Sequence, residues 1–350
     1  MKIVIPGGSG QVGNVLARYF HKSGHNVVVL SRQPRAAAWR NVYWDGETVG
    51  DWAAEFEQAD AVINLAGRSV NCRYNNRHRR QIMESRVRSV RAVGAAINAC
   101  QQPPRAWLQM STATIYAHRY DAPNDELTGI LGGNEPHAPD TWRFSIEVAR
   151  AWEQTCDEFV TPQTRRLKLR LAMLMNVDRG GTFDLLLSLV RHGLGGKSGN
   201  GRQYMSWIHE QDFIRAVEWL IEHSEIEGVV NLAAPNPLPN ADFMRGLRAA
   251  WGARFGLPAT EWMLAIGTRL MRTESELILK SRRVVPGRLL EAGFAFDFPH
   301  WPAGARELCQ RWRAGNARSA QNRSSVAANS AEQGAYSFSN TTNGAIGTRP

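Results

Sequence analysis

The 350-residue chain is predicted to form an α/β fold built on a doubly wound parallel sheet. Two observations predict this class. Apolar, strand-like runs alternate with helical patterns over the first 175 residues, and the first run leads through a glycine-rich turn into a helix. After Asn176, glycine-rich stretches alternate with helical segments, so a smaller region of α+β character is expected at the carboxyl end.

The glycine-rich turn is the most informative segment. Residues 2–5 (KIVI) are expected to form a strand, residues 6–13 (PGGSGQVG) the turn, and residues 15–20 the body of a helix. Only glycine tolerates the positive φ of so tight a turn and lets the backbone approach a pyrophosphate. The phosphates would then lie on free N–H groups of the helix's first turn. An ordinary βα turn is the alternative to dinucleotide binding by Gly7, Gly8, Ser9, Gly10, Gln11, Val12 and Gly13.

The following residues complete a βαβ unit of the Rossmann type. The helix closes with Gly24, and residues 26–30 (NVVVL) are expected to form a second parallel strand that ends in Ser31 and Arg32. An NAD site usually carries an acid here for the ribose hydroxyls. A hydroxyl and a guanidinium can instead grip a 2′-phosphate. The sequence therefore favours NADP(H) as the cofactor, with NAD(H) possible and a solvated Arg32 as the alternative.

The other predicted strands and helices are as follows. The buried strand at 59–67 ends in small residues, which leave space for a ligand beside the sheet. After Asn176 one further strand is expected at 229–233. The other expected strands are 41–45, 107–116 and 166–175, and the expected helices are 51–58, 79–98, 141–159, 183–192, 211–223 and 240–251.

Three regions are expected. Residues 1–175 would form the NADP(H)-binding Rossmann domain, and 176–313 the substrate side, which includes a small domain at about 252–302. Residues 314–350 are rich in Ser, Asn, Ala, Gly and Thr and have scarcely any apolar side chains, so we expect a disordered tail.

Composition restricts the class of protein. With 43% hydrophobic residues the chain can bury a large core, and no apolar run approaches the roughly 20 residues that span a bilayer. The first strand begins at once and leaves no room for a signal peptide, so a cytoplasmic protein is expected. The four cysteines are far apart, without metal spacing. The net charge of +10 is scattered except at residues 73–80, where a solvated or substrate-facing loop is favoured over a nucleic-acid groove.

Several separate motifs together resemble the extended short-chain dehydrogenases/reductases, in the NAD-dependent epimerase/dehydratase subgroup. They are the glycine turn and residues 64–67 (NLAG), 84–87 (ESRV), 111–116 (STATIY), 169–170 (LR) and 207–212 (WIHEQD). Residues 280–299 resemble the small DUF1731-like domain of unknown function that closes such chains, and the likeness covers about 1–313. The resemblance implies that Gly7, Gly10 and Gly13 hold the pyrophosphate, Ser31 and Arg32 the adenosine phosphate, and Leu65, Ala66 and Gly67 the ribose.

The same resemblance places Thr112 at the catalytic Ser/Thr position, with Ser111 beside it. The family's usual tyrosine and lysine, one helical turn apart, are absent, because none of the seven tyrosines has a lysine four residues later. Residues 144–150 of the expected helix offer neither side chain, although Trp152-Glu153 fits the subgroup. The proton donor is therefore unnamed; Tyr116 at the predicted strand end is a candidate, with core packing as the favoured alternative.

Two further pairs of residues are candidates for a role in the site. His209 and Asp212 are expected on the substrate side, where His209 could titrate near neutrality. The favoured alternative is structural: His209 would hydrogen-bond a turn while Asp212 caps the following helix. Arg143 and Arg150 are expected to be solvated helix charges rather than ligands.

Two functions from different classes remain. The first is an NADP(H)-dependent oxidoreductase or epimerase that acts on a small carbonyl or sugar-like substrate, without metal, nucleic acid or membrane. The second is a nicotinamide-binding regulatory or sensor module that lacks the tyrosine–lysine pair. Neither the substrate nor the oligomeric state can be inferred from the sequence.

Overall fold

A computed structural model describes residues 1–136, 138–259 and 280–317. Its centre is a seven-stranded sheet of order β10-β6-β5-β4-β1-β2-β3, in which every pair of neighbours is parallel. This confirms the predicted doubly wound α/β fold, because the chain starts in the middle of the sheet and winds outward in both directions. The strands are β1 Lys2–Pro6, β2 Asn26–Ser31, β3 Arg40–Tyr43, β4 Ala61–Asn64, β5 Ala106–Thr112, β6 Arg165–Leu171 and β10 Gly228–Leu232.

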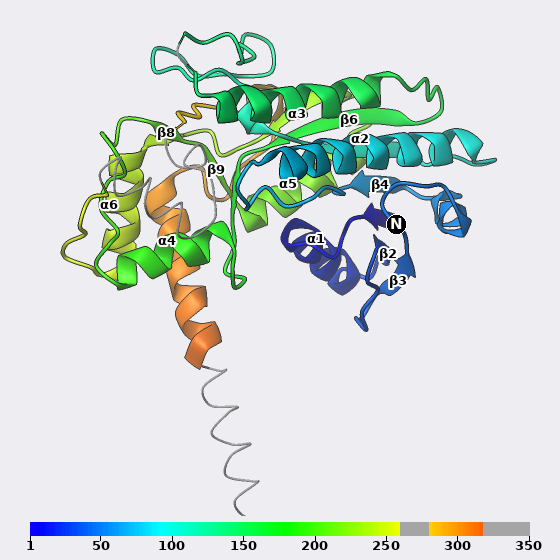
Figure 1. Cartoon of the computed structure of the whole chain (residues 1–350). Coiled ribbons are helices and arrows are strands. Elements are labelled where there is room, and N and C mark those ends of the chain that lie inside the picture. Colours follow the sequence, from blue (N-terminus) through cyan, green and yellow to red (C-terminus); the bar gives the residue numbers. More distant parts are fainter. Residues whose placement is uncertain (137, 260–279, 318–350) are drawn as a thin grey trace, which may run out of the picture.

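Helices cover both faces of the sheet. In Figure 1, α2 and α3 run side by side in the upper part of the molecule, whereas α1 lies lower and contacts α5. Fully buried apolar residues of β1, β2 and β4 fill the space between these layers, as expected for parallel strands that are covered on both faces. The helices are α1 Gln11–Lys22, α2 Asn76–Ala99, α3 Asp140–Asp157 and α5 Glu210–Glu222.

A second, smaller core forms beyond the carboxyl edge of the sheet. Trp301 stacks on Phe243 at 3.9 Å and meets Trp207 edge-on at 4.9 Å between ring centroids. This core joins α4 Thr182–Arg191, α6 Asn240–Trp251 and a helix over 301–317. Two-stranded ladders support it: β7 Met173–Met175 with β9 Trp207–His209, and β8 Tyr204–Met205 with β11 Leu238–Pro239. The short helix α9 Gly287–Glu291 packs against β10.

The predicted strand at 229–233 is confirmed as β10, and its position adds to the domain prediction. It forms the edge of the main sheet, so the sheet takes its last strand from the region assigned to the substrate side. The division at residue 175 stays a prediction. Most of the predicted small domain at 252–302 is described, but 260–279 lie outside the described residues.

Some predicted boundaries were wrong. The strand predicted at 107–116 ends at Thr112, and a 3-10 turn, η2 Ala113–Ile115, carries the chain out of the sheet. The helix predicted at 51–58 is the 3-10 helix η1 Asp51–Phe56, which ends two residues earlier. The helix predicted from residue 79 begins at Asn76, where Asn75 accepts a hydrogen bond from the His78 amide as its N-cap.

The start predicted for the disordered tail, residue 314, is also too early. Residues 314–317 continue the helix that begins at 301, and the rest of the predicted tail lies outside the described residues.

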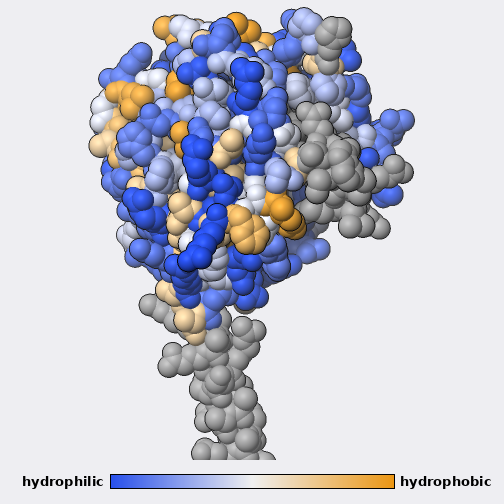
Figure 2. Space-filling model, turned by 90° about the vertical axis from the view of Figure 1, so that its left-hand side faces the viewer, coloured by the Kyte–Doolittle hydropathy of each residue, from blue (hydrophilic) through white to orange (hydrophobic). Residues whose placement is uncertain are grey.

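Hydrophilic residues cover most of the face in Figure 2, with apolar ones in small groups between them. Within the described ranges, we find no helix long and apolar enough to cross a bilayer.

Candidate functional site

The glycine turn is shaped by close backbone contacts. Gly7 has φ +75°, and a Cβ on it would lie 2.6 Å from the Cα of Ala66 at the end of the neighbouring strand β4. A Cβ on Gly13 would lie 2.4 Å from the Cα and the carbonyl oxygen of Gly8. Carbon atoms in contact prefer 3.5–4.0 Å, so any side chain at Gly7 or Gly13 would displace backbone. These two glycines are therefore required by the turn itself.

Gly10 differs from them. A Cβ on Gly10 would meet no atom closer than the Gly7 carbonyl oxygen at 3.8 Å, and its φ of −78° is open to any residue. Gly10 is the N-cap of α1, yet no side chain caps this helix. The first-turn N–H groups of a helix need partners from outside the helix. The turn thus leaves an open space next to N–H donors, which suits the phosphates of a dinucleotide.

The end of β2 borders this space. Ser31 is buried, and its hydroxyl donates to the Ser9 hydroxyl at 3.0 Å, while the Gln33 amide donates to Ser31 Oγ at 3.2 Å. Arg32 is exposed, and its guanidinium has no hydrogen-bond or ion-pair partner among the residues that the structure describes. Arg32 directly follows Ser31, whose hydroxyl contacts the glycine turn at Ser9, and the predicted role of Arg32 toward a 2′-phosphate stays a prediction.

The turn after β4 lies on the other side of Gly7. The buried Asn64 side chain accepts a hydrogen bond from the Ala66 amide at 3.1 Å and donates to Gln109 Oε1 at 2.9 Å. The Leu65 amide donates to the Pro6 carbonyl at 2.8 Å. These bonds fix residues 65–67 against the glycine turn. Leu65, Ala66 and Gly67 thus share the edge of the sheet with the other predicted cofactor residues.

The end of β5 carries Ser111 and Thr112. Ser111 is buried, and its hydroxyl donates to Glu153 Oε1 at 2.6 Å. Glu153 of α3 also accepts two hydrogen bonds from the Arg170 guanidinium of β6, at 2.8 and 2.7 Å. Thr112 is only half-buried; its Oγ1 accepts from the Thr114 amide at 3.2 Å, which leaves the hydroxyl proton to donate. Of these two hydroxyls, that of Thr112 is the one whose proton has no acceptor among the described residues.

Tyr116 lies in the core. Its hydroxyl donates to Asn231 Oδ1 at 3.0 Å, and the Arg170 guanidinium lies 4.9 Å from the ring centroid. Burial raises the pKa of the Tyr116 phenol, which makes it a weaker acid. The strand end that made Tyr116 a candidate does not exist, because β5 stops four residues earlier. This geometry favours the packing alternative.

His209 and Asp212 are fully buried, away from solvent. His209 Nε2 is 2.8 Å from Glu307 Oε2, its ring stacks on Phe298 at 3.9 Å, and its Nδ1 accepts from the Gln211 amide as the N-cap of α5. Asp212 accepts from the amides of Asp297 and Phe298 at 2.8 and 2.9 Å. Both polar groups serve the docking of the carboxyl-terminal region. The structural alternative fits, with the helix capped by His209 rather than Asp212.

Two buried cations contact Thr114 and were not singled out in the sequence. Lys280 Nζ donates to the Thr114 carbonyl at 2.8 Å, and Arg282 Nε donates to Thr114 Oγ1 at 3.2 Å. Both side chains are buried. Burial together with these two charges lowers the pKa of His118. The sequence shows them only as part of a carboxyl-terminal motif, because their contact with residue 114 spans more than 160 positions.

Other predicted features are placed as follows. In the 73–80 cluster, Arg79 pairs with Asp140 and lies 4.8 Å from the Phe144 ring centroid. Arg143 is exposed, whereas Arg150 donates to the Gly132 carbonyl at 2.9 Å. No group of three metal-ligating side chains occurs in the described part of the chain. Burial raises the pKa of the Cys156 thiol to about 12, so this thiol is protonated at neutral pH.

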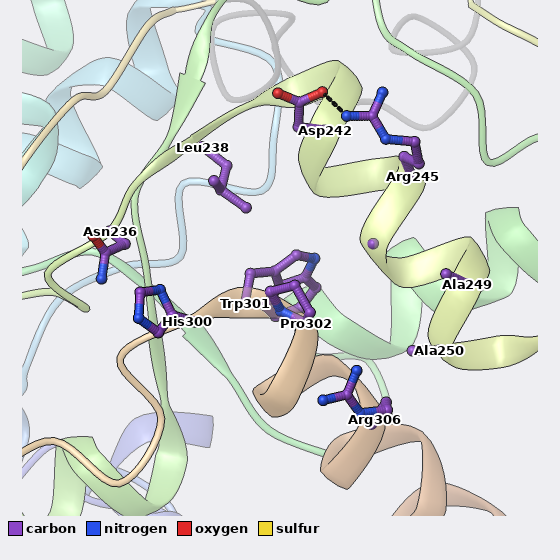
Figure 3. Close-up of a pocket in the computed structure, with 11 residues that line it drawn as sticks. Asn236, Leu238, Asp242, Arg245, Ala249, Ala250, His300, Trp301, Pro302 and Arg306 are labelled. Carbon is purple, nitrogen blue, oxygen red and sulfur yellow. Dashed lines mark hydrogen bonds and ion pairs between the residues drawn. The ribbon is translucent and has the colours of Figure 1, made fainter.

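Two hollows lie apart from the glycine turn. The one in Figure 3, of about 630 Å³, lies between α6 and the start of the 301–317 helix, and Leu238, Gly246 and Trp301 are among its lining residues. The other, of about 1260 Å³, lies at the amino ends of the strands, around Met1, Asp60 and Arg105. None of the predicted site residues lines either hollow.

Comparison with known proteins shows which families parts of the chain are similar to. The model of the NAD dependent epimerase/dehydratase family matches residues 3–153, and a domain of unknown function, DUF1731, matches 259–308. Residues 3–153 are therefore similar to the NAD dependent epimerase/dehydratase family. The predicted resemblance to extended short-chain dehydrogenases/reductases with a DUF1731 end is thereby confirmed.

Relatives of this family span nearly the whole chain. The human epimerase family protein SDR39U1 is 27% identical over 311 residues, 88% of this chain and 99% of the relative. The epimerase family protein YfhF of Bacillus subtilis is 27% identical over 301 residues, 85% of this chain and 94% of the relative.

Solved structures agree with the fold. The structure of human SDR39U1 isoform 2, solved with NADPH, superposes with a TM-score of 0.76 at 27% identity and covers 89% of this chain and 99% of that one. A UDP-N-acetylglucosamine 4-epimerase from Bacillus cereus has a TM-score of 0.67, covers 89% and 99%, and at 16% identity supports the fold alone.

Proposed function

We propose that this protein is an NADP(H)-dependent oxidoreductase or epimerase that acts on a small carbonyl or sugar-like substrate. The observation that carries the proposal is the open space at Gly10, next to the uncapped start of α1 and beside the unengaged Arg32. The fold does not require a glycine at position 10, whereas a bound diphosphate does. The NADPH present in the human relative supports the same coenzyme.

Each part of the coenzyme has residues suited to it. The first-turn N–H groups of α1 and the turn from Gly7 to Gly13 would hold the diphosphate. Ser31 and Arg32 would bind the 2′-phosphate, since a guanidinium fork matches phosphate oxygens. Leu65, Ala66 and Gly67 would line a ribose. When bound, the coenzyme supplies a nicotinamide ring that donates or accepts a hydride.

Thr112 is the group proposed to hold the substrate. Its hydroxyl can donate to a substrate oxygen because the hydroxyl proton has no acceptor among the described residues. A threonine hydroxyl is too basic to release its proton alone, so its role is to orient the substrate. Ser111 contributes indirectly, because its bond to Glu153 fixes the end of β5.

A sensor is the second candidate. The tyrosine–lysine pair is absent, the Tyr116 hydroxyl is bound to Asn231, and the Ser111 hydroxyl is bound to Glu153. A protein of this kind would bind the coenzyme tightly without consuming it, and would respond to its redox state by a change in the region after residue 175.

Turnover distinguishes the two. Purified protein is incubated with NADPH and a panel of aldehydes, ketones and sugar derivatives, and the absorbance of the reduced coenzyme is followed. An oxidoreductase consumes NADPH, whereas an epimerase returns the coenzyme to its starting state and is detected by conversion of a sugar derivative to its epimer. Either activity should be lost in Thr112→Ala and partly kept in Thr112→Ser, with unchanged NADPH affinity in both. Tight binding with neither NADPH consumption nor epimer formation across the panel would support the sensor instead.

A further inference from the structure

A turn from the second half of the chain is fastened over the start of α1. The Asp178 carboxylate accepts two hydrogen bonds from the Arg18 guanidinium, at 3.0 and 2.8 Å. The Arg179 carbonyl accepts from the Gln11 side chain at 3.4 Å. Gln11 is the first residue of α1 and follows Gly10 directly. Residues 178–181 therefore lie next to the open space at the glycine turn.

The conformation of this turn is well defined. The Gly181 amide donates to the Asp178 carbonyl at 3.2 Å, and Gly180 has φ +75°. A positive φ at the third residue is what a type II turn requires, and it leaves Arg179 at the second position. A Cβ on Gly181 would lie 2.7 Å from Asn176 Oδ1, so the residue after Gly180 is also tightly placed.

Two acidic side chains in and after this turn have partners, whereas its arginine has none among the described residues. Asp178 is neutralised by Arg18, and Asp184 accepts from the Gly180 amide at 2.9 Å. The Arg179 side chain is exposed and has no partner among the described residues. Its backbone is thus held beside the start of α1 while its guanidinium is unengaged. Because the α1 terminus is already favourable for anions, an added cation there strengthens the attraction for a diphosphate.

We propose that Arg179 binds the diphosphate of the coenzyme, and that the Arg18–Asp178 and Gln11–Arg179 contacts are the latch that holds it there. This inference rests on the proposed coenzyme binding. It adds a ligand from outside the βαβ unit, which the glycine turn alone does not reveal.

The diphosphate and the 2′-phosphate can be separated by comparing two coenzymes. Both NADPH and NADH carry the diphosphate, so Arg179→Ala should raise the dissociation constants of both by about tenfold, the effect of one charge-assisted hydrogen bond. Arg179→Lys should lose less, because it keeps the charge without the fork. Arg32→Ala should weaken NADPH alone. Arg306→Ala, an exposed arginine on the 301–317 helix, is the control and should change neither constant.

The latch is tested in the same titrations, in which the fluorescence of the reduced coenzymes measures binding. Asp178→Asn should raise both dissociation constants, as Arg179→Ala does. The double variant should bind little more weakly than Arg179→Ala alone. Thermal melting checks that each variant is folded. Unchanged constants in a folded Arg179→Ala would overturn the Arg179 assignment alone. Wild-type protein that binds neither coenzyme would overturn this inference together with the proposed function.

Discussion

Alanine substitutions at Gly10 and Gly13 distinguish a glycine that coenzyme binding requires from a glycine that folding requires. At Gly13 the added methyl would lie 2.4 Å from backbone atoms of Gly8, more than 1 Å inside ordinary contact. Overpacking of this kind costs about 1–3 kcal/mol or more. At Gly10 the methyl meets nothing within 3.8 Å, so only the weaker N-cap preference of alanine counts, at about 1 kcal/mol or less.

For coenzyme binding, in contrast to stability, we expect a large effect of the substitution at Gly10. A methyl at Gly10 occupies the space proposed for the phosphates, and we expect NADPH affinity to fall at least tenfold. At a coenzyme concentration 100 times the wild-type dissociation constant, bound NADPH stabilises the wild type by about 2.7 kcal/mol. A tenfold weaker variant would gain only about 1.4 kcal/mol at that concentration.

Urea unfolding with and without NADPH measures both effects. Gly13→Ala should be less stable than wild type without ligand. Gly10→Ala should be close to wild type without ligand but should gain less on adding NADPH. The reasoning fails if Gly10→Ala binds NADPH as wild type does, because the open space would then have no ligand to serve.

Three further predictions concern the interior. Glu153→Gln removes one partner of a buried ion pair and should destabilise the fold by about 3–5 kcal/mol in urea unfolding, whereas a loss below about 1 kcal/mol would show that Arg170 finds another partner. Tyr116→Phe leaves Asn231 Oδ1 without its donor and should cost about 1–3 kcal/mol while any turnover is kept; loss of turnover in a folded variant would restore Tyr116 as a proton donor. Burial raises the pKa of Glu126, so its ionisation destabilises the folded state as pH rises above about 4.3, the unfolded value. Glu126→Gln should therefore gain stability relative to wild type as pH rises from 4 toward the raised pKa, and a pH-independent difference would contradict this sign.

Local patterns allowed much of the fold to be predicted. The helix at 240–251 and the strand at 229–233 were placed closely, because apolar periodicity and glycine or proline boundaries are encoded within each segment. The glycine turn was also predictable, since strand, turn and helix are contiguous. The cofactor residues follow from it, because the carboxyl ends of neighbouring parallel strands meet at one edge.

The errors concern contacts between distant residues. Residues 107–116 contain no charged residue, glycine or proline, so nothing local marks Thr112 as the last strand residue. The bond of its side chain to the Thr114 amide ends the strand. The Glu153 and Arg170 motifs were noticed separately, but their pairing depends on how α3 packs beside β6. The burial of His209 likewise depends on Glu307, almost 100 positions away.

The most direct test is a calorimetric titration of the wild-type chain with NADPH and, separately, with NADH. The account predicts saturable one-site binding of both, tighter for NADPH, with the advantage of NADPH lost in Arg32→Ala. Absence of heat with either coenzyme, in a chain shown to be folded by its melting transition, would contradict it.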